Sequence, residues 1–334
     1  MSLYVKFWGV RGSLPSSMTP QGWNSHIQNI LSEYDTRKHP MSGSAGMNTT
    51  ASTSQFLSNK KLEEVGGYGT GTTCVEVKSP KVQLIIDGGT GIRNFSEKIM
   101  SGTSGPVKGP YHIYMTHFHW DHVMGLPFFT PHFISGTQIH YYGVEKDIET
   151  LIRGIFRKPY FPVAFEQLAA KIHFHVMEPR VPVKIDDMTL TPYLLDHPDP
   201  CWGLKVESGG KCYSHCVDTE GTRVSRDELG PDVPLYENVD LMYFDAQYTF
   251  PELAEKANWG HSAAQIGLDL AFRENIRKVL FAHHDPGATI DQIRAIKEQT
   301  HEYFQWRLDH ARECNEKIPD CEWDFAFEGL EIKL

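Results

Sequence analysis

The sequence lacks any long uninterrupted hydrophobic stretch, and no window approaches the roughly 18 apolar residues that a membrane span needs. The N-terminal segment MSLYVKFWGVRG also lacks the basic, then apolar, then small-residue order of a signal peptide. We therefore expect a chain that does not cross a membrane and that works in the cytoplasm.

Cysteine is scarce, with six in 334 residues, and no two of them form a C-x-x-C pair. That number is too small for a disulfide scaffold at this length. Cys212 and Cys216 enclose His215, but they lie in the β-type run KCYSHCV, where strand alternation accounts for the spacing. We expect reduced thiols and no cysteine metal site.

Positive charge is also in short supply. The chain has 32 Lys and Arg against 42 Asp and Glu, a formal net charge of −10. This balance opposes broad, nonspecific contact with nucleic acid phosphates. Any phosphate that the protein handles must meet a local positive site, and bound metal ions could supply one.

Nucleotide-cofactor motifs are missing as well. The glycine-rich segments GGYGTGTTC and DGGTGIRN fit neither the G-x-G-x-x-G nor the Walker spacing. We interpret both as tight turns between strands.

What the chain does contain is a series of short β-type runs, mostly bounded by Gly, Pro, Asn or Asp. They are CVEVK, VQLIID, YHIYMT, QIHYYG, LTPYLL, GLKVE, KCYSHCV, DLMYFD and KVLFAH. Helical periodicity appears at 262–274 and at 289–310, each segment opened by a Ser or Thr that can cap it. The pattern predicts an α/β protein, with strands in sheets and helices packed outside them.

Residues 13–66 differ from this pattern, because they are rich in Ser, Thr, Gly, Pro and Asn and carry only a weak helical pattern near 25–34. We predict that they form a surface insertion. No linker divides the chain, so we expect a single domain over residues 1–334.

The segment THFHWDH at 116–122 carries the strongest chemical signal. It follows the strand YHIYMT, and in an extended turn His117, His119 and Asp121 would project to one side. Asp121 and His122 would diverge and could serve a neighbouring ion. Imidazoles with a carboxylate suit zinc or a similar cation, and the spacing favours two ions.

A histidine-rich surface turn without an ion is the alternative interpretation. It is disfavoured because apolar runs flank the segment on both sides, where unsatisfied polar groups would be costly to bury.

THFHWDH resembles the T-H-x-H-x-D-H signature of the metallo-β-lactamase superfamily, which implies a four-layer αββα sandwich. By the same resemblance, Asp87 in IIDGGTG would orient a ligand histidine. His197 in LLDHPD would be the third histidine, and Asp218 in CVDTEG the bridging aspartate. The last ligand would be His283 in FAHHDP, with the adjacent His284 as the alternative.

Further segments resemble the phosphodiesterase side of that superfamily, which includes ribonuclease Z and cyclic-phosphate phosphodiesterases. They are FWGVRGSLP, GTGTTCVEV, DGGTGIR, NWGHSAAQ and FAHHDP. The resemblance implies that His261 in NWGHS assists the leaving group. Ser262 can cap the helix that begins there, and a helix N-terminus favours phosphate.

The roles implied by the resemblance describe a dinuclear centre. His117, His119 and His197 would hold one ion. Asp121, His122 and His283 would hold the other, and Asp218 would bridge the two. Asp121 and His261 are the candidate catalytic residues. Two divalent ions are expected, zinc first, with manganese and iron as alternatives.

The expected function is hydrolysis of a small phosphodiester, such as a cyclic nucleotide or cyclic phosphate. Rivals are a thioester or lactam hydrolase of the same fold and a noncatalytic metal-binding sensor. Ribonuclease Z proper is disfavoured, because its long basic arm is not evident and the net charge opposes nucleic acid as a partner. A homodimer is compatible with the sequence. The remaining histidines are assigned to surface or core, among them His132, His140, His173, His175 and His301.

Overall fold

The computed structural model describes residues 2–38, 53–102 and 109–334, and it places fourteen strands in two seven-stranded sheets. The first sheet has the order β14 (Glu331–Lys333), β1 (Tyr4–Gly9), β2 (Cys74–Lys78), β3 (Gln83–Ile86), β4 (Tyr111–Tyr114), β5 (Gln138–Gly143) and β6 (Lys171–Val176). The second has the order β13 (Glu322–Phe325), β12 (Lys278–Ala282), β11 (Leu241–Asp245), β10 (Lys211–Cys216), β9 (Trp202–Ser208), β8 (Met188–Leu194) and β7 (Val183–Ile185).

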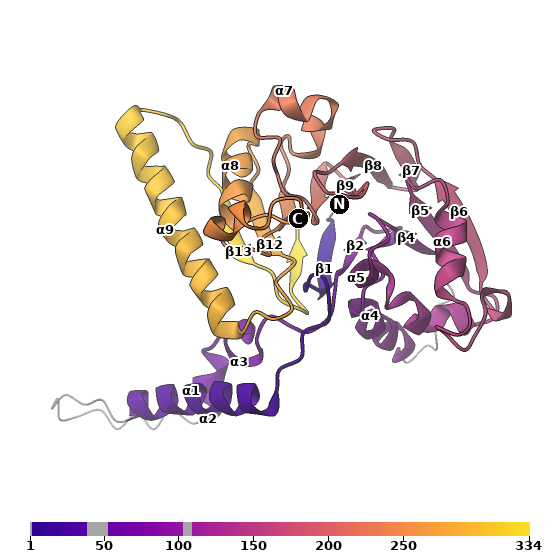
Figure 1. The fold of residues 1–334 in the computed structure, drawn as a ribbon, viewed down its shortest axis with the longest axis horizontal. Coiled ribbons are helices and arrows are strands. Elements are labelled where there is room, and N and C mark those ends of the chain that lie inside the picture. The colour runs from indigo at the N-terminus through magenta and orange to yellow at the C-terminus, as the bar shows by residue number, and fades with distance from the viewer. Residues whose placement is uncertain (1, 39–52, 103–108) are drawn as a thin grey trace.

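Helices lie outside both sheets (Figure 1). Those beside the first sheet are α4 (Gly91–Met100), α5 (Trp120–Val123) and α6 (Ile148–Ile155), and those beside the second are α7 (Arg226–Leu229), α8 (Ala264–Glu274) and α9 (Ile290–Cys314). Short 3₁₀ turns span Leu126–Phe128, Thr130–Phe133, Phe165–Gln167, Gly230–Leu235 and Phe250–Ala254. None of the helices in these described ranges is long and apolar enough to cross a membrane.

Three hydrophobic clusters separate four layers. The central cluster joins the inner faces of the sheets, with Val5 and Leu84 from the first and Leu204 and Leu280 from the second. A second cluster packs α4, α5 and α6 on the first sheet, and a third packs α8 and α9 on the other. Strand side chains alternate between an inner and an outer core, as expected when both sheet faces are covered. The predicted αββα sandwich is confirmed.

The predicted strands all form, with ends shifted by one or two residues. The long C-terminal helix begins as expected at Thr289, whose hydroxyl accepts a hydrogen bond from the Gln292 amide at 3.2 Å. The prediction that Ser262 caps α8 is wrong. Ala263 occupies the N-cap position, and the Ser262 hydroxyl donates to the Glu220 carbonyl at 3.1 Å.

Residues 13–66 contain more helix than the weak pattern near 25–34 predicted. The described parts form α1 (Pro20–Lys38), α2 (Thr53–Ser58) and α3 (Leu62–Gly66), which extend from one side of the sandwich below α9 (Figure 1). Packing between segments explains the added helix, because the Tyr34 ring of α1 lies 5.2 Å from the Phe56 ring of α2. Residues 39–52 of the predicted insertion lie outside the described residues.

Candidate metal centre

The candidate ligands lie in loops that leave neighbouring strands. In the first sheet β3 and β4 run parallel, and in the second β10, β11 and β12 do. Carboxyl ends of parallel strands meet at one edge of a sheet. The loops at these ends carry Asp87 after β3, His117 after β4, Asp218 after β10 and His283 after β12.

The backbone after β4 differs from the expected extended turn. His119 is extended, with φ −63° and ψ 154°, but Trp120–Val123 then form one helical turn, α5. The prediction that Asp121 continues an extended alternation is therefore wrong. The helical turn is closed by the Met124 amide, which donates to the Trp120 carbonyl at 2.8 Å. Asp121 and His122 are successive residues of this turn, so their side chains leave it in different directions.

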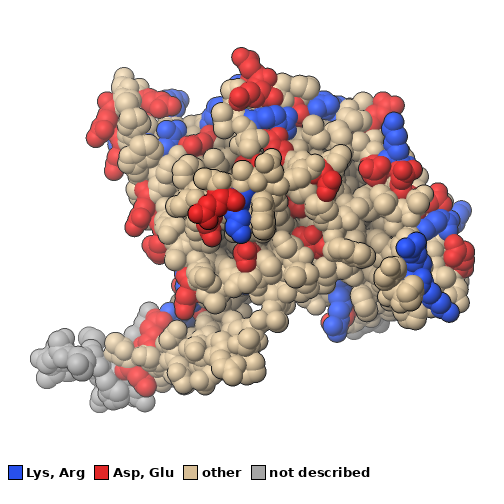
Figure 2. Space-filling model, in the orientation of Figure 1, with Lys and Arg blue, Asp and Glu red and all other residues tan. Residues whose placement is uncertain are grey.

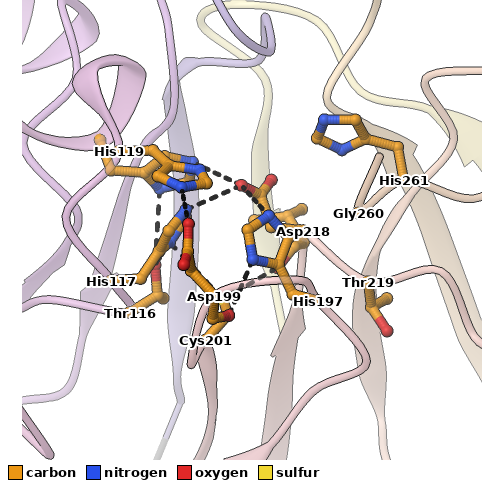
Figure 3. Close-up of polar contacts among 12 residues, drawn as sticks. Thr116, His117, His119, His197, Asp199, Cys201, Asp218, Thr219, Gly260 and His261 are labelled. Atoms are coloured by element: carbon orange, nitrogen blue, oxygen red, sulfur yellow. Dashed lines mark hydrogen bonds and ion pairs between the residues drawn. The ribbon is translucent and has the colours of Figure 1, made fainter. Parts of the chain in front are cut away.

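The first group of ligands comprises His117, His119, His197 and Asp218, each of which offers one nitrogen or oxygen atom within 4.8 Å of the others. His117 Nε2 lies 3.1 Å from Asp218 Oδ2, and His197 Nε2 lies 4.0 Å from the same oxygen. Figure 3 shows these side chains around Asp218. His119 is the most accessible, with 44% of its side chain exposed.

The second group comprises Asp121, His122, Asp218 and His283, under the same 4.8 Å limit. His283 Nε2 lies 2.8 Å from Asp218 Oδ1 and 3.2 Å from Asp121 Oδ2. His122 Nε2 lies 3.1 Å from Asp218 Oδ2. Asp218 is thus common to both groups. Of the tandem histidines, His283 belongs to the cluster, whereas His284 Nε2 donates to the Ala326 carbonyl at 2.8 Å.

Each of the five histidines has one ring nitrogen fixed by the protein and the other turned to the cluster. His122 Nδ1 donates to Asp87 Oδ2 at 2.8 Å, as the resemblance implied for Asp87. His283 Nδ1 donates to Gln247 Oε1 at 3.0 Å, and His117 Nδ1 lies 3.1 Å from the Thr116 hydroxyl. Such contacts set the tautomer and orientation of metal-binding imidazoles.

Asp199 holds the remaining two histidines. His119 Nε2 donates to the Asp199 carboxylate at 2.8 Å, and His197 Nδ1 donates to the Asp199 carbonyl at 2.9 Å (Figure 3). One exposed residue therefore orients two imidazoles of the first group. Neither Asp199 nor Gln247 was identified from the sequence, because their contacts form only when separate loops fold together.

The remaining nitrogens and oxygens fit divalent ions. His117 Nε2, His122 Nε2 and Asp218 Oδ1 are buried and lack a hydrogen-bond partner, although charged groups lie within about 3 Å. Buried polar atoms are seldom left unsatisfied in native proteins. Imidazole nitrogens and carboxylate oxygens are ligands of zinc and related cations. The residues present therefore fit divalent metal ions, and Asp218 belongs to both groups.

Protonation in the metal-free protein follows from burial and charge. Burial lowers the pKa of His117 to about 4, so this imidazole is neutral. Burial also lowers the pKa of His283, but Asp218 and Asp121 outweigh it and raise the value to about 10. Burial opposes ionisation of Asp218, yet His283 and His122 hold its pKa well below the usual range. Without metal, protonated histidines therefore balance the carboxylates.

His261 lies beside both groups but is held by a different carboxylate, Asp245. Its Nδ1 donates to Asp245 Oδ2 at 3.0 Å, and its ring centre lies 4.9 Å from that of His283. Asp245 also accepts the amide hydrogens of Asp218 and Ser262, at 3.1 Å each. Although Asp245 and His261 form a third four-residue group with Asp218 and His283, these bonds assign Asp245 to positioning.

Asp245 was not identified from the sequence. A signal was present, since Asp245 ends the strand run DLMYFD much as Asp87 follows VQLII.

Several site residues adopt a strained backbone. Asp87, Asp218 and His283 have φ of 63°, 61° and 62°, in the left-handed region that costs a non-glycine residue about 1 kcal/mol or more. Glycines permit two close approaches. A Cβ on Gly12 would lie 2.4 Å from His283 Nδ1, and one on Gly260, with φ 88°, would lie 2.3 Å from the His197 ring.

Comparison with protein families gives a match to the beta-lactamase superfamily domain over residues 83–284. Ribonuclease Z of Staphylococcus carnosus is 26% identical over 141 residues, covering 40% of this chain and 42% of that enzyme. Ribonuclease Z of Staphylococcus haemolyticus is 22% identical over 243 residues, covering 57% of this chain and 76% of that enzyme. The first of these matches thus spans less than half of the relative's length.

Solved structures resemble the whole chain. The metallo-beta-lactamase fold protein YhfI from Bacillus subtilis has a TM-score of 0.60 at 14% identity, with 100% of this chain and 99% of that one covered. Unliganded yeast PDE1 also has a TM-score of 0.60 at 14% identity, with 99% of each chain covered. At these identities the likeness concerns the fold. The predicted resemblance to the phosphodiesterase branch agrees with both comparisons.

Proposed function

Because the chain belongs to the metallo-β-lactamase superfamily, we propose that it is a metal-dependent phosphodiesterase acting on a small cyclic nucleotide or cyclic phosphate. The observation that carries this proposal is the Asp245–His261 pair, whose imidazole lies 4.9 Å from the His283 ring and 6.4 Å from the His197 ring, between centres. A proton donor next to two groups of metal ligands suits a substrate with a poor, alkoxide leaving group.

The proposal keeps the division of metal ligands that the resemblance implied. His117, His119 and His197 would hold one ion, Asp121, His122 and His283 the other, and Asp218 both. When bound, two divalent ions polarise phosphoryl oxygens and lower the pKa of the attacking water toward neutrality. Zinc fits these donors, and manganese and iron are alternatives.

His261 would protonate the departing oxygen. Its Nδ1–H is engaged with Asp245, so Nε2 is the ring atom that remains for the substrate. The buried Asp245 carboxylate accepts this hydrogen bond and fixes the ring orientation. The Tyr248 ring contacts the His261 ring edge-on, with ring centres 5.7 Å apart.

A substrate panel with the zinc-loaded protein tests this proposal. We expect hydrolysis of a cyclic nucleotide and of bis(p-nitrophenyl) phosphate, but not of a glutathione thioester or a β-lactam. His261→Ala should reduce the rate on the cyclic nucleotide by about 10²–10⁴-fold and clearly less on the nitrophenyl ester, whose leaving group departs without a proton.

The panel separates the rival functions. Preference for the thioester or lactam would overturn the phosphodiesterase proposal. Metal binding without hydrolysis of any substrate would instead favour a noncatalytic sensor. Equal losses for His261→Ala on both phosphodiesters would refute proton donation.

Ribonuclease Z activity is the second candidate, and the names of the curated relatives favour it. The net charge of −10 disfavours a nucleic acid substrate. On the face shown in Figure 2, Lys and Arg side chains are interspersed with Asp and Glu. Cleavage of a precursor tRNA more efficient than that of the cyclic nucleotide would establish this second candidate.

A further inference from the structure

The loop between β11 and α8 exposes an indole beside His261. Trp259 is 59% exposed, although burial of an apolar ring of this size is usually favourable. The next residue, Gly260, packs against His197, so the backbone at this point is fixed to the candidate metal centre. Figure 3 shows Gly260 and His261 on the side of Asp218 away from His117 and His119. Trp259 therefore lies on the His261 side of the site.

The Trp259 indole is linked to His261 through Lys256 and Tyr248. Lys256 Nζ lies 4.3 Å from the centre of the Trp259 ring and 5.4 Å from that of Tyr248. The buried Tyr248 ring in turn contacts His261 edge-on. An ammonium over an aromatic face is favourable and helps to hold the indole in place. Lys256, Trp259 and His261 thus form one continuous group.

Hydrogen bonds within the loop and to Glu220 fix its conformation. Thr249 donates its hydroxyl hydrogen to Glu252 at 2.6 Å, and the Lys256 amide donates to the Glu252 carbonyl at 3.0 Å. Farther along, the Gly260 amide donates to Glu220 Oε1 at 2.9 Å. Little ordering would be needed on binding, which favours affinity.

We propose that Trp259 and Lys256 form a subsite for the nucleoside part of the substrate, with the base stacked on Trp259. The inference rests on the proposed function and narrows its substrate class to nucleotides. In a cyclic nucleotide the departing oxygen belongs to the sugar, so the sugar and its base lie on the side of the phosphorus that faces the proton donor. His261 is that donor, and Trp259 is two residues away. Lys256 adds a positive charge near polar atoms of the base or sugar.

Two cyclic phosphodiesters test the subsite, adenosine 2′,3′-cyclic phosphate and the base-free glycerol 1,2-cyclic phosphate. Trp259→Ala should lower kcat/KM on the nucleotide by about 5- to 150-fold, mainly through KM, as expected for the loss of one base–aromatic stack. On the glycerol compound its kcat/KM should change by less than about twofold, and Trp259→Phe should restore most of the loss. Trp306→Ala is the matched control, because Trp306 is a 55% exposed tryptophan on α9.

Binding of AMP to the zinc-loaded protein, measured by calorimetry, provides a readout that does not depend on turnover. Trp259→Ala should weaken it by a similar factor. Equal losses on both substrates, or unchanged AMP affinity, would overturn the subsite. So would a nucleotide-specific loss in Trp120→Ala alone, since Trp120 is exposed beside His119. If the wild-type protein hydrolyses neither compound, the proposed function fails, which is a different result from hydrolysis of both without dependence on Trp259.

Discussion

At the scale of single residues, the exposed Asp199 orients two of the candidate metal ligands. Its side chain is 71% exposed, yet its carboxylate and carbonyl orient His119 and His197. Asp199→Ala should leave the fold intact and weaken zinc binding by about 10- to 100-fold, the usual cost of losing a group that orients a metal ligand. Competition with a chelating dye measures this directly.

The matched control for this prediction is Asp291→Ala. Asp291 is equally exposed, at 71%, but lies in the first turn of α9 and pairs with Arg294. Zinc affinity should not change in this variant. An unchanged affinity in Asp199→Ala itself would show that His119 does not depend on the Asp199 carboxylate, because the backbone carbonyl that accepts from His197 remains in the variant.

The ligand residues could be predicted individually because histidine and aspartate at fixed spacing form a recognisable pattern. Of the residues that orient them, Asp87 was predicted through the resemblance, but the others could not be. Asp199, Gln247 and Asp245 act through distances fixed only when separate loops fold together, 80 residues apart for His119 and Asp199. The left-handed backbone at Asp218 and His283 was also not predictable, because non-glycine residues adopt it only occasionally and the local sequence does not mark where.

At the scale of elements, the loop that follows β1 packs closely against the candidate metal centre. The Ser13 amide donates to Asp121 Oδ2 at 2.7 Å, and a Cβ at Gly12 would lie 2.4 Å from both His283 Nδ1 and Gln247 Oε1. Gly12→Ala should therefore displace His283 and reduce the bound zinc by up to one ion per chain. Elemental analysis of the folded variant measures the loss.

Gly154→Ala in α6 is the control for that substitution. A Cβ at Gly154 meets no atom within 4 Å, and alanine stabilises a helix by about 0.5–1 kcal/mol over glycine. This variant should keep full metal content and melt at the same or a higher temperature. Normal metal content in Gly12→Ala would show that Gly12, in the loop after β1, does not constrain the position of His283.

Elements were predictable where periodicity and caps decide them, and less so where tertiary contacts do. Apolar runs bounded by turn residues located nine of the fourteen strands described, and Thr289 marked the start of α9. Ser262 failed as a cap because its hydroxyl is engaged by Glu220 and its amide by Asp245. The helical turn of α5 was missed because Trp120–Val123 is too short to show a helical period.

At the scale of the whole molecule, a buried histidine away from the metal centre should make folding sensitive to acid. His132 is fully buried, its Nε2 lies 2.8 Å from the Tyr141 hydroxyl, and burial lowers its pKa to about 3. The unfolded chain takes up a proton near pH 6.5, whereas the folded one does not until about pH 3. Stability present above pH 6.5 should therefore be lost as the pH falls, by up to about 1.4 kcal/mol per pH unit.

Melting curves of the metal-free protein between pH 7 and pH 4.5 test whether its stability falls as the pH falls. His132→Gln removes the titrating group and keeps a polar partner for Tyr141, so its stability should fall less steeply with acid than that of the wild type. His301→Gln, an exposed position on α9, should leave the slope unchanged. If the stability of His132→Gln falls as steeply with pH as that of the wild type, His132 does not cause the predicted acid sensitivity.

The number of divalent ions bound per chain tests the central claim most directly. The two ligand groups, which share Asp218, predict about two zinc ions per chain after reconstitution with excess metal and removal of free ions, measured by elemental analysis. Asp218→Ala should lower that number. A reproducible value of one or less in the wild type would contradict the dinuclear centre, and with it the proposed division of roles among the seven ligands.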